Sequence, residues 1–210
     1  MKKFLTLALA ALSFFGAVTA ANNTKKAAPK DTLVFTTIVS APVTSIKNQN
    51  NSGTCWAYSS LAFLESEALK KNPSLKPADV DLCESFVVAK TYNDRADRAV
   101  RTHGDVSFSQ GGSFYDVIYC MDRYGLVPEG TMPYPKTLYG DSLFNFKHFF
   151  PGLEAFVGSV AKGDHKTINP IWKKTVAQMV DGYFGEAPKT FKVKGKEYTP
   201  HTYVKDYLRL

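Results

Sequence analysis

A polar stretch near position 50 gives way abruptly to apolar residues at helical spacing. Ala57, Leu61, Leu64 and Ala68 recur at intervals of four, three and four residues. This spacing predicts a helix over residues 55–71 with one buried stripe. Further apolar side chains lie on its other faces, so we expect the helix to be buried inside a domain; they are Trp56, Ala62 and Phe63.

Later segments mix helical and extended patterns, which predicts an α+β fold. A run of β-branched and apolar residues predicts a strand over 32–39, and residues 190–198 predict a hairpin that turns at 194–195. Helical signals occupy much of the remainder: a capping-box sequence at 81–84, a charged stretch at 91–104 that is partly helix or loop, a helical insertion within 139–163, and helices that begin at 168–170 and 199–200.

The helix predicted over residues 113–125 has clear ends. Ser113 is suited to cap its start, and Gly125 is suited to end it. Its apolar stripe is expected to consist of Phe114, Val117, Ile118 and Met121.

Cys55 stands at the predicted start of the first helix, after a polar loop that contains Gly53. The free N–H groups and the positive end of the helix dipole favour a thiolate there. A thiolate is the reactive form of cysteine, so Cys55 is a candidate nucleophile. The alternative is a buried structural cysteine beside a core tryptophan, Trp56.

Residues 43–58 resemble the active-site segment of papain-like cysteine peptidases. In that family a glutamine six positions before the nucleophile donates its side-chain amide to the oxyanion, and Gln49 has that separation from Cys55. Prealigned donors stabilise the negative oxygen of the tetrahedral intermediate. Gln49, Gly53, Cys55 and Trp56 all fit this register, which favours a peptidase over a structural cysteine.

A second block strengthens the resemblance. Gly111 and Gly112, the helix after them and residues 124–135 resemble the corresponding segment of the bleomycin hydrolase or aminopeptidase C branch. The resemblance implies that Gly111, Gly112 and Trp56 contact an extended peptide substrate. A helix cap and loop would also account for these glycines taken alone.

Two serines separate this chain from the common secreted branch of the family. Members of that branch usually carry a cysteine three residues before the nucleophile, bonded to another just ahead of the Gly-Gly pair. Ser52 and Ser109 occupy these positions, which again favours the bleomycin hydrolase branch. The other two thiols, Cys83 and Cys120, fall in helical patterns as small core residues, and a disulfide between them stays open.

The histidine and asparagine that such a nucleophile requires are not evident. His201 lies 146 residues after Cys55 (201 − 55), but it follows a helix-start signal, and none of the nine residues after it is asparagine. The other histidines occupy polar or aromatic stretches; they are His103, His148 and His165.

The expected fold is therefore mainly the helical, nucleophile-bearing lobe of a papain-like peptidase. We expect residues 33–210 to form this domain, incomplete at its C-terminus, with the β-rich lobe largely absent. The expected function is cysteine peptidase, of the aminopeptidase type by resemblance, without metal or cofactor. The alternative is a catalytically incomplete peptide-binding lobe or pseudopeptidase.

The N-terminus predicts export. Residues 1–20 have a positive start, an apolar core and small residues before position 21, as in a cleaved signal peptide, and residues 21–32 predict a flexible leader. Cleavage would leave a soluble protein in the periplasm or outside the cell. The alternative is an uncleaved membrane anchor, since the apolar run approaches the length that spans a bilayer. The family resemblance implies peptide substrates as partners and assembly of the complete protein into a homo-oligomer.

The basic composition does not by itself indicate a nucleic-acid partner. The formal charge of +7 falls to +5 without Lys2 and Lys3 (7 − 2), and no nucleic-acid motif accompanies the lysines of residues 189–196. A solvated hairpin explains that cluster better.

Overall fold

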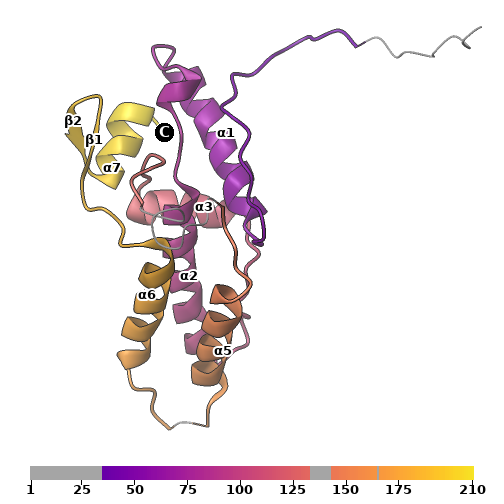
Figure 1. Cartoon of the computed structure of the whole chain (residues 1–210), viewed down its shortest axis with the longest axis vertical. Helices are drawn as coiled ribbons and strands as arrows, with labels where there is room; N and C mark the ends of the chain where they lie inside the picture. Colours follow the sequence, from indigo (N-terminus) through magenta and orange to yellow (C-terminus); the bar gives the residue numbers. More distant parts are fainter. Residues whose placement is uncertain (1–34, 133–142, 165) are drawn as a thin grey trace, which may run out of the picture. The chain divides into compact units, whose positions relative to one another are not determined.

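Figure 1 shows a computed structural model of the chain, in which residues 35–132, 143–164 and 166–210 are described. The chain divides into two units, Met1–Ile38 and Val39–Leu210. The predicted signal peptide and leader lie outside the described residues.

The strand predicted over residues 32–39 is not formed where it is described. Residues 35–39 have neither helix nor strand, and Phe35 and Ile38 are exposed. A strand needs a neighbour to complete its hydrogen bonds, and the two strands in the described residues pair with each other. Residues 32–34 lie outside the described part.

The second unit is mainly helical with one small sheet. Helix α2 is central, since it packs against α1, α3, α5 and α6, and the C-terminal segments pack against α3 and α1. The elements are α1 (Cys55–Lys71), a 3-10 turn (Pro77–Asp79), α2 (Glu84–Arg101), α3 (Phe114–Tyr124), α5 (Phe149–Lys162), α6 (Ile171–Phe184), β1 (Phe191–Val193), β2 (Lys196–Tyr198) and α7 (Pro200–Thr202), which continues as a π-helix (Tyr203–Leu208).

Helix α1 confirms the predicted bounds and the predicted stripe, whose four residues are all buried. The expectation that the helix is buried on its other faces is only partly right. Trp56 is buried, but Ala62 is exposed and 52% of Phe63 is accessible. One face of α1 is therefore open, and there Phe63 meets Phe114 edge to face, with ring centroids 5.4 Å apart.

Helix α2 differs from prediction at both ends. It begins at Glu84 rather than after Asp81, because Cys83 N–H donates to Val127 and Glu129 N–H donates to Asp81, which holds residues 81–83 in a short extended pairing. It then runs through the charged stretch to Arg101, because its small and apolar side chains face the core while Arg98 and Arg101 are exposed. The inward residues there are Ala96, Ala99 and Val100.

Helix α3 has the predicted ends. Ser113 N–H donates to Asp116 over 2.8 Å, and Gly125 follows the last turn with φ +77°. Val117 is fully buried as expected, but 45% of Phe114 is exposed, so its place in the buried stripe is wrong. Phe114 lies on the open side, where it meets Phe63.

An aromatic core joins α2 to α5 and α6. The Tyr92 ring of α2 contacts Phe146, Phe150 and Phe184 at centroid distances of 6.2, 5.4 and 6.5 Å. This confirms a helical insertion that packs on the core, although the helix occupies only residues 149–162 of the predicted stretch. Residues 139–142 lie outside the described part.

The predicted hairpin and final helix are both present. Phe191 pairs with Tyr198, and Lys194 and Gly195 turn the chain with φ of +50° and +83°. Thr199 accepts a hydrogen bond from Thr202 N–H over 3.2 Å, as a helix cap does.

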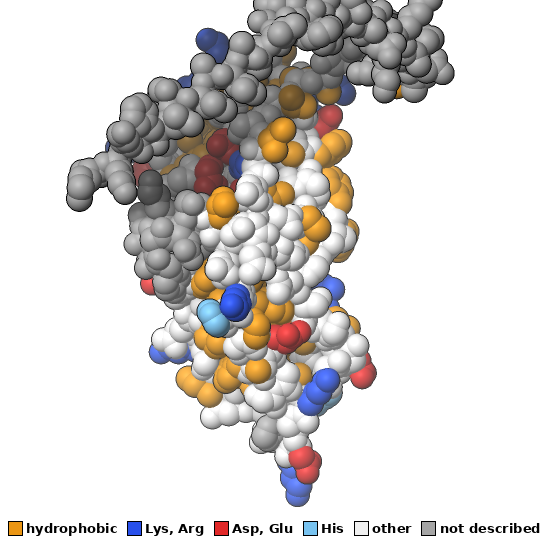
Figure 2. Space-filling view, turned by 45° about the vertical axis from the view of Figure 1, so that its right-hand side comes forward, with side chains coloured by type: hydrophobic (Ala, Val, Ile, Leu, Met, Phe, Trp, Pro, Cys, Tyr) orange, Lys and Arg blue, Asp and Glu red, His pale blue; other side chains and the backbone are white. Residues whose placement is uncertain are grey.

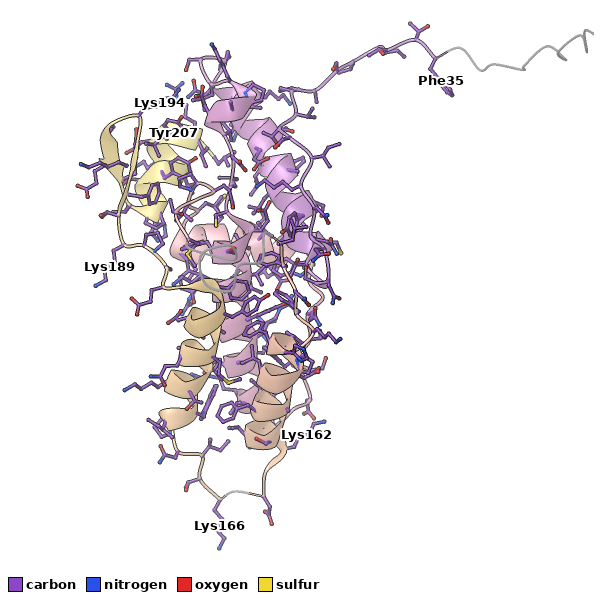
Figure 3. All side chains as sticks on the ribbon, viewed as in Figure 1. Phe35, Lys162, Lys166, Lys189, Lys194 and Tyr207 are labelled. Atoms are coloured by element: carbon purple, nitrogen blue, oxygen red, sulfur yellow. The ribbon has the colours of Figure 1, made fainter. Side chains whose placement is uncertain are left out.

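Two lysines of the hairpin segment, Lys189 and Lys194, lie apart (Figure 3). Lys194 lies close to Tyr207 and forms an ion pair of 2.8 Å with Asp79, whereas Lys189 lies at the other end of the hairpin (Figure 3). Basic side chains are also scattered over the face that Figure 2 shows. This distribution fits a solvated surface.

In the described part of the chain, no helix combines the length and the apolar character needed to span a bilayer.

Candidate active site

Cys55 is exposed at the first position of α1, a helix of 17 residues. The Thr54 carbonyl before it accepts from the N–H groups of Ala57 and Tyr58 at 2.9 and 3.3 Å, so the helical turn closes around this point. The alternative of a buried structural cysteine is therefore wrong for Cys55. The placement matches the requirement for a nucleophile at the positive end of a helix.

The other two thiols have a different environment. Cys83 and Cys120 are buried and free, without a disulfide between them. Burial raises the pKa of Cys120 to about 12, and burial likewise raises the pKa of Cys83 far above its usual range. Both remain neutral thiols at physiological pH, which leaves Cys55 as the accessible thiol of the chain.

Gln49 is held in a tight loop just before the helix. Its side-chain Nε2 donates to the Ser52 carbonyl over 2.8 Å, and Ser52 Oγ donates back to the Gln49 carbonyl over 2.8 Å. An amide nitrogen carries two N–H groups. Within the described residues, the second N–H of Gln49 has no protein acceptor, so it is available to a ligand.

Lys47 fixes the segment that leads to Gln49. Its Nζ lies 2.6 Å from Asp81, 2.9 Å from Glu84 and 2.7 Å from the Leu82 carbonyl. Residues 35–50 have no regular secondary structure, so side-chain contacts must determine where this segment lies.

A second group of contacts holds the other end of the loop. Asn50 Nδ2 donates to the Phe144 carbonyl over 2.9 Å, and Phe146 N–H donates to the Asn51 carbonyl over 2.9 Å. The loop before Cys55 is thus tied to the helical core on one side and to residues 144–146 on the other.

The buried carboxylates around Lys47 have perturbed protonation. Glu84 is 5% exposed, and burial raises its pKa to about 7, although Lys47 opposes the shift. Burial also raises the pKa of Glu65, which accepts from Leu82 N–H over 2.7 Å and from the Thr44 hydroxyl. The pKa of Lys47 lies above its usual range, because the charges of Glu84 and Asp81 outweigh the opposing effect of burial.

The two glycines of the predicted cleft wall differ in their surroundings. A Cβ on Gly112 would lie 2.5 Å from Trp56 Cδ2 and 2.6 Å from Arg95 Nη2, so only glycine fits. A Cβ on Gly111 would meet no atom within 4 Å. Gly112 therefore permits close packing against α1 and α2, while Gly111 faces open space.

A groove of about 680 Å³ runs along these residues. Cys55, Trp56 and Gly112 line it together, and Phe63 and Phe114 add an apolar wall. Three of the five predicted site residues thus share one groove. Gly111 is exposed beside Gly112, and Gln49 lies on the preceding loop rather than in the groove lining.

None of the described histidines lines this groove. His201 lines a different one with Tyr119 and Val204, and His148 lies in a groove between α5 and α6. His103 is exposed at the end of α2. His165 lies outside the described residues. The described part of the chain therefore brings no imidazole into the Cys55 groove.

Comparison with known proteins decides the family. The Peptidase C1-like family matches residues 3–142, two thirds of the chain. The chain belongs to the Peptidase C1-like family. Aminopeptidase G of Lactobacillus delbrueckii subsp. lactis is 27% identical over 135 residues, covering 54% of this chain and 28% of that protein.

A solved structure supports the same fold for this Peptidase C1-like chain. The crystal structure of PepW from Lactobacillus rhamnosis HN001 superposes with a TM-score of 0.55 and 17% identity, covering 85% of this chain and 46% of PepW. The helices with their small sheet are the helical lobe of a papain-like fold. The chain spans less than half the length of either relative.

Several residues that shape the site of this Peptidase C1-like chain were not foreseen. Gln110 directly precedes the glycine pair, and Lys47 lies two residues before Gln49. Their closeness in sequence to predicted site residues could have indicated that they contribute to the site. Arg95 sits in the charged stretch at 91–104, where nothing in the pattern distinguished it. The apolar wall of Phe63 and Phe114 was missed because both residues were expected to be buried.

In the described residues, no cluster of three or more His, Cys, Asp or Glu side chains has the arrangement of a metal site.

Proposed function

We propose that Cys55 is the nucleophile of an exported cysteine peptidase that cleaves peptides from their N-terminal end. One observation carries this proposal: the exposed Cys55 thiol begins α1 within a groove that it shares with Trp56 and Gly112, in a chain of the Peptidase C1-like family. An accessible thiol at a helix N-terminus is suited to attack a bound carbonyl.

In the proposed reaction, the Cys55 thiolate forms a bond to the carbonyl carbon of the scissile peptide. The carbonyl π electrons move to oxygen, and the N–H of Cys55 and the free N–H of Gln49 stabilise the resulting oxyanion. The intermediate then expels the amine, which leaves a thioester on Cys55 that water hydrolyses. Gly111 and Gly112 would hold the extended substrate beside the thiol.

Proton transfer requires an imidazole that the described groove does not contain. The base must take the thiol proton before attack and return a proton to the leaving amine. We propose that a histidine outside the described lining of the groove completes the site, either elsewhere in the complete protein or in a partner copy.

The aminopeptidase assignment is the finer part of the proposal. It is supported by the relative named Aminopeptidase G and by the resemblance of the glycine-pair region to the bleomycin hydrolase branch. Export is supported by the charged and apolar pattern of residues 1–20, and assembly into a homo-oligomer is an expectation from the same resemblance.

A peptide-binding lobe without catalysis is the second candidate. It is favoured by one observation, that no described histidine lines the groove of Cys55. Such a protein would bind peptides through the glycine wall without cleaving them.

The experiment measures hydrolysis of aminoacyl fluorogenic substrates by the complete protein, its Cys55→Ser variant and its Gln49→Ala variant. We expect Cys55→Ser to abolish turnover and Gln49→Ala to lower kcat by about 10²–10³-fold with a smaller change in KM, as the loss of an oxyanion donor does. Blocking the substrate N-terminus by acetylation should prevent cleavage by an aminopeptidase.

The outcomes separate the candidates. Full turnover by Cys55→Ser would rule out Cys55 as the nucleophile. Saturable peptide binding without turnover by the complete wild-type protein would establish the peptide-binding lobe instead. If acetylated substrates are cleaved as readily as substrates with a free N-terminus, the peptidase assignment stands and the aminopeptidase assignment is rejected.

A further inference from the structure

Residues 109–111 are held by side chains rather than by secondary structure. Three consecutive carbonyl groups in this irregular segment each accept a side-chain hydrogen bond. Arg95 Nη1 donates to the Ser109 carbonyl over 3.1 Å and also to the Gly111 carbonyl. Between them, Trp56 Nε1 donates to the Gln110 carbonyl over 2.9 Å. Helices α1 and α2 therefore determine the path of this backbone.

The Arg95 guanidinium also forms an ion pair with Asp116, which follows Gly112 in the sequence. Its Nη2 lies 3.0 Å from Asp116 Oδ2, and the same carboxylate accepts from Ser113 N–H over 2.8 Å. The Arg95 side chain is only 16% exposed, although it carries a full charge. One side chain thus connects the residues before Gly112 with those after it.

Trp56 completes the packing around Arg95. The guanidinium carbon lies 5.2 Å from the centroid of the Trp56 ring, within the range of a cation–π contact. Gly112 lies against both groups, since an added Cβ would be within 2.7 Å of each. The backbone of Gly112 therefore lies between the Arg95 guanidinium and the Trp56 indole ring.

The same segment is coupled directly to the nucleophile loop. Gly53 N–H donates to Gln110 Oε1 over 2.7 Å, and Trp56 is the residue after Cys55. A displacement of residues 110–112 would break contacts on both sides of Cys55. Residues 110–112 and the residues on either side of Cys55 consequently share one network of contacts.

Arginine is suited to this position for a geometric reason. Its planar guanidinium presents five N–H donors in a rigid fork and can bind two carbonyls and a carboxylate at once. Lysine has a compact ammonium group on a flexible stem and cannot reproduce that planar arrangement. In the described part of the chain, the N–H groups of Gly111 and Gly112 have no protein acceptor, so a peptide could pair with them.

We propose that Arg95 is a positioning residue of the peptidase cleft: it holds the backbone of Gly111 and Gly112 against the nucleophile helix so that an extended peptide docks beside Cys55. This inference rests on the proposed function, because the docked peptide is the substrate of that reaction. Arg95 itself contacts the backbone of Ser109 and Gly111 and does not contact the Cys55 thiol.

The test compares two reagents on the complete protein. A peptidyl epoxide must bind beside Gly111 and Gly112 before it alkylates Cys55, whereas iodoacetamide needs no such binding. We expect Arg95→Met and Arg95→Lys to lower the second-order rate of peptidyl labelling about tenfold or more, which corresponds to the loss of one or two hydrogen bonds. The iodoacetamide rate should change by no more than about twofold, as expected if the thiol itself is undisturbed.

Arg98→Met is the matched control, because Arg98 is exposed on the same helix. It should leave both labelling rates unchanged. Asp116→Asn keeps the side-chain shape and weakens the ion pair with Arg95. It should therefore also lower the rate of peptidyl labelling, by a smaller factor than the Arg95 variants do. This variant keeps the test usable if Arg95→Met does not fold.

Hydrogen exchange provides a readout that does not depend on labelling. Amide exchange at Gly53 and Ser113, whose N–H groups donate to Gln110 and Asp116, should accelerate about tenfold in Arg95→Lys and remain unchanged in Arg98→Met. If peptidyl labelling and amide exchange both remain at wild-type values in the Arg95 variants, Arg95 is not a positioning residue. If both reagents slow equally, the effect is on the thiol, and the proposal is also overturned.

A failure of the proposed function has a different signature. In that case the peptidyl reagent would label wild-type Cys55 no faster than a free cysteine of the same concentration, and peptide competition would have no effect. Unchanged exchange at Gly53 and Ser113 in Arg95→Lys would still overturn the positioning role, because that measurement does not depend on peptide binding.

Discussion

Gly111 and Gly112 show how two adjacent identical residues acquire different constraints. Gly112 packs against Trp56 and Arg95, where an added Cβ would come within 2.7 Å of both, while Gly111 has no atom within 4 Å of that position. The sequence marks both as glycine and cannot distinguish them. The difference arises because α2 brings Arg95 to one side of the pair only.

The first prediction follows from this asymmetry. Gly112→Ala should destabilise the fold by about 1–3 kcal/mol, the usual cost of overpacking, because neither the indole nor the guanidinium can move without breaking hydrogen bonds. Gly111→Ala should change the free energy of unfolding by less than about 0.5 kcal/mol, as at an unconstrained surface position. Urea denaturation of both variants measures the difference; equal stabilities would show that Gly112 is not confined.

Glu84 illustrates a residue whose chemistry depends on burial. Its carboxyl is 5% exposed beside Lys47, and burial raises its pKa to about 7. An unfolded glutamate titrates near 4.3. Between these values the folded chain binds more protons than the unfolded chain, so the contribution of Glu84 to stability falls as pH rises through this window.

The second prediction concerns that window. Relative to Glu84→Gln, which does not titrate, wild-type protein should lose about 1–3 kcal/mol of unfolding free energy between pH 4.5 and 7.5. The exposed Glu154 provides the control, since the difference in unfolding free energy between wild-type protein and Glu154→Gln should stay constant over the same pH range. Urea melts at several pH values give the comparison. A wild-type minus Glu84→Gln difference that stays constant with pH would contradict the assigned pKa.

At the scale of elements, α5 is held to the core by its apolar side. Leu153 and Val157 are fully buried where α5 packs against α2 and α6. Helices of this length are marginal in isolation and depend on such burial for stability. The packing of α5 therefore contributes to the core that supports residues 144–146 and, through them, the loop of Gln49.

The third prediction tests this packing. Leu153→Ala should cost about 2–5 kcal/mol, because it removes buried methyl groups and leaves a cavity. Glu154→Ala changes the exposed neighbour and should cost less than about 0.5 kcal/mol. Thermal unfolding followed by circular dichroism compares the two. Similar melting temperatures would mean that α5 is not part of the cooperative core.

At the scale of the whole molecule, the described residues bring the proposed nucleophile and part of the proposed cleft wall into one groove that no described histidine lines. Cys55, Trp56 and Gly112 share a groove, and His201 and His148 line other grooves. A thiol without its imidazole partner can still be alkylated, but it lacks the proton transfers that turnover requires.

The fourth prediction follows for the 210-residue chain by itself. Its rate of aminoacyl-substrate hydrolysis should not exceed that of its Cys55→Ser variant, while iodoacetamide should modify Cys55 ahead of Cys83 and Cys120. Fluorescence assays and intact mass spectrometry measure the two properties. Turnover above the variant would show that a histidine of this chain reaches Cys55.

The local patterns predicted much of the second unit. The bounds of α1, the capped ends of α3, the turn at Lys194 and Gly195 and the cap at Thr199 were all confirmed, because each depends on residues close in sequence. Predictions that needed a distant partner were less successful. The strand over 32–39 has no neighbour where it is described, and α2 starts at Glu84 because residues 127–129 pair with those before it.

By itself, the sequence determined the candidate nucleophile, its glutamine and the glycine pair, since fixed spacings along the chain carry that information. Tertiary structure alone decided that Arg95 binds the backbone of residues 109–111, that Lys47 lies among buried carboxylates and that Phe63 and Phe114 face the groove. These contacts join residues up to about 50 positions apart. Their geometry and burial depend on how the helices pack, which local spacing does not encode.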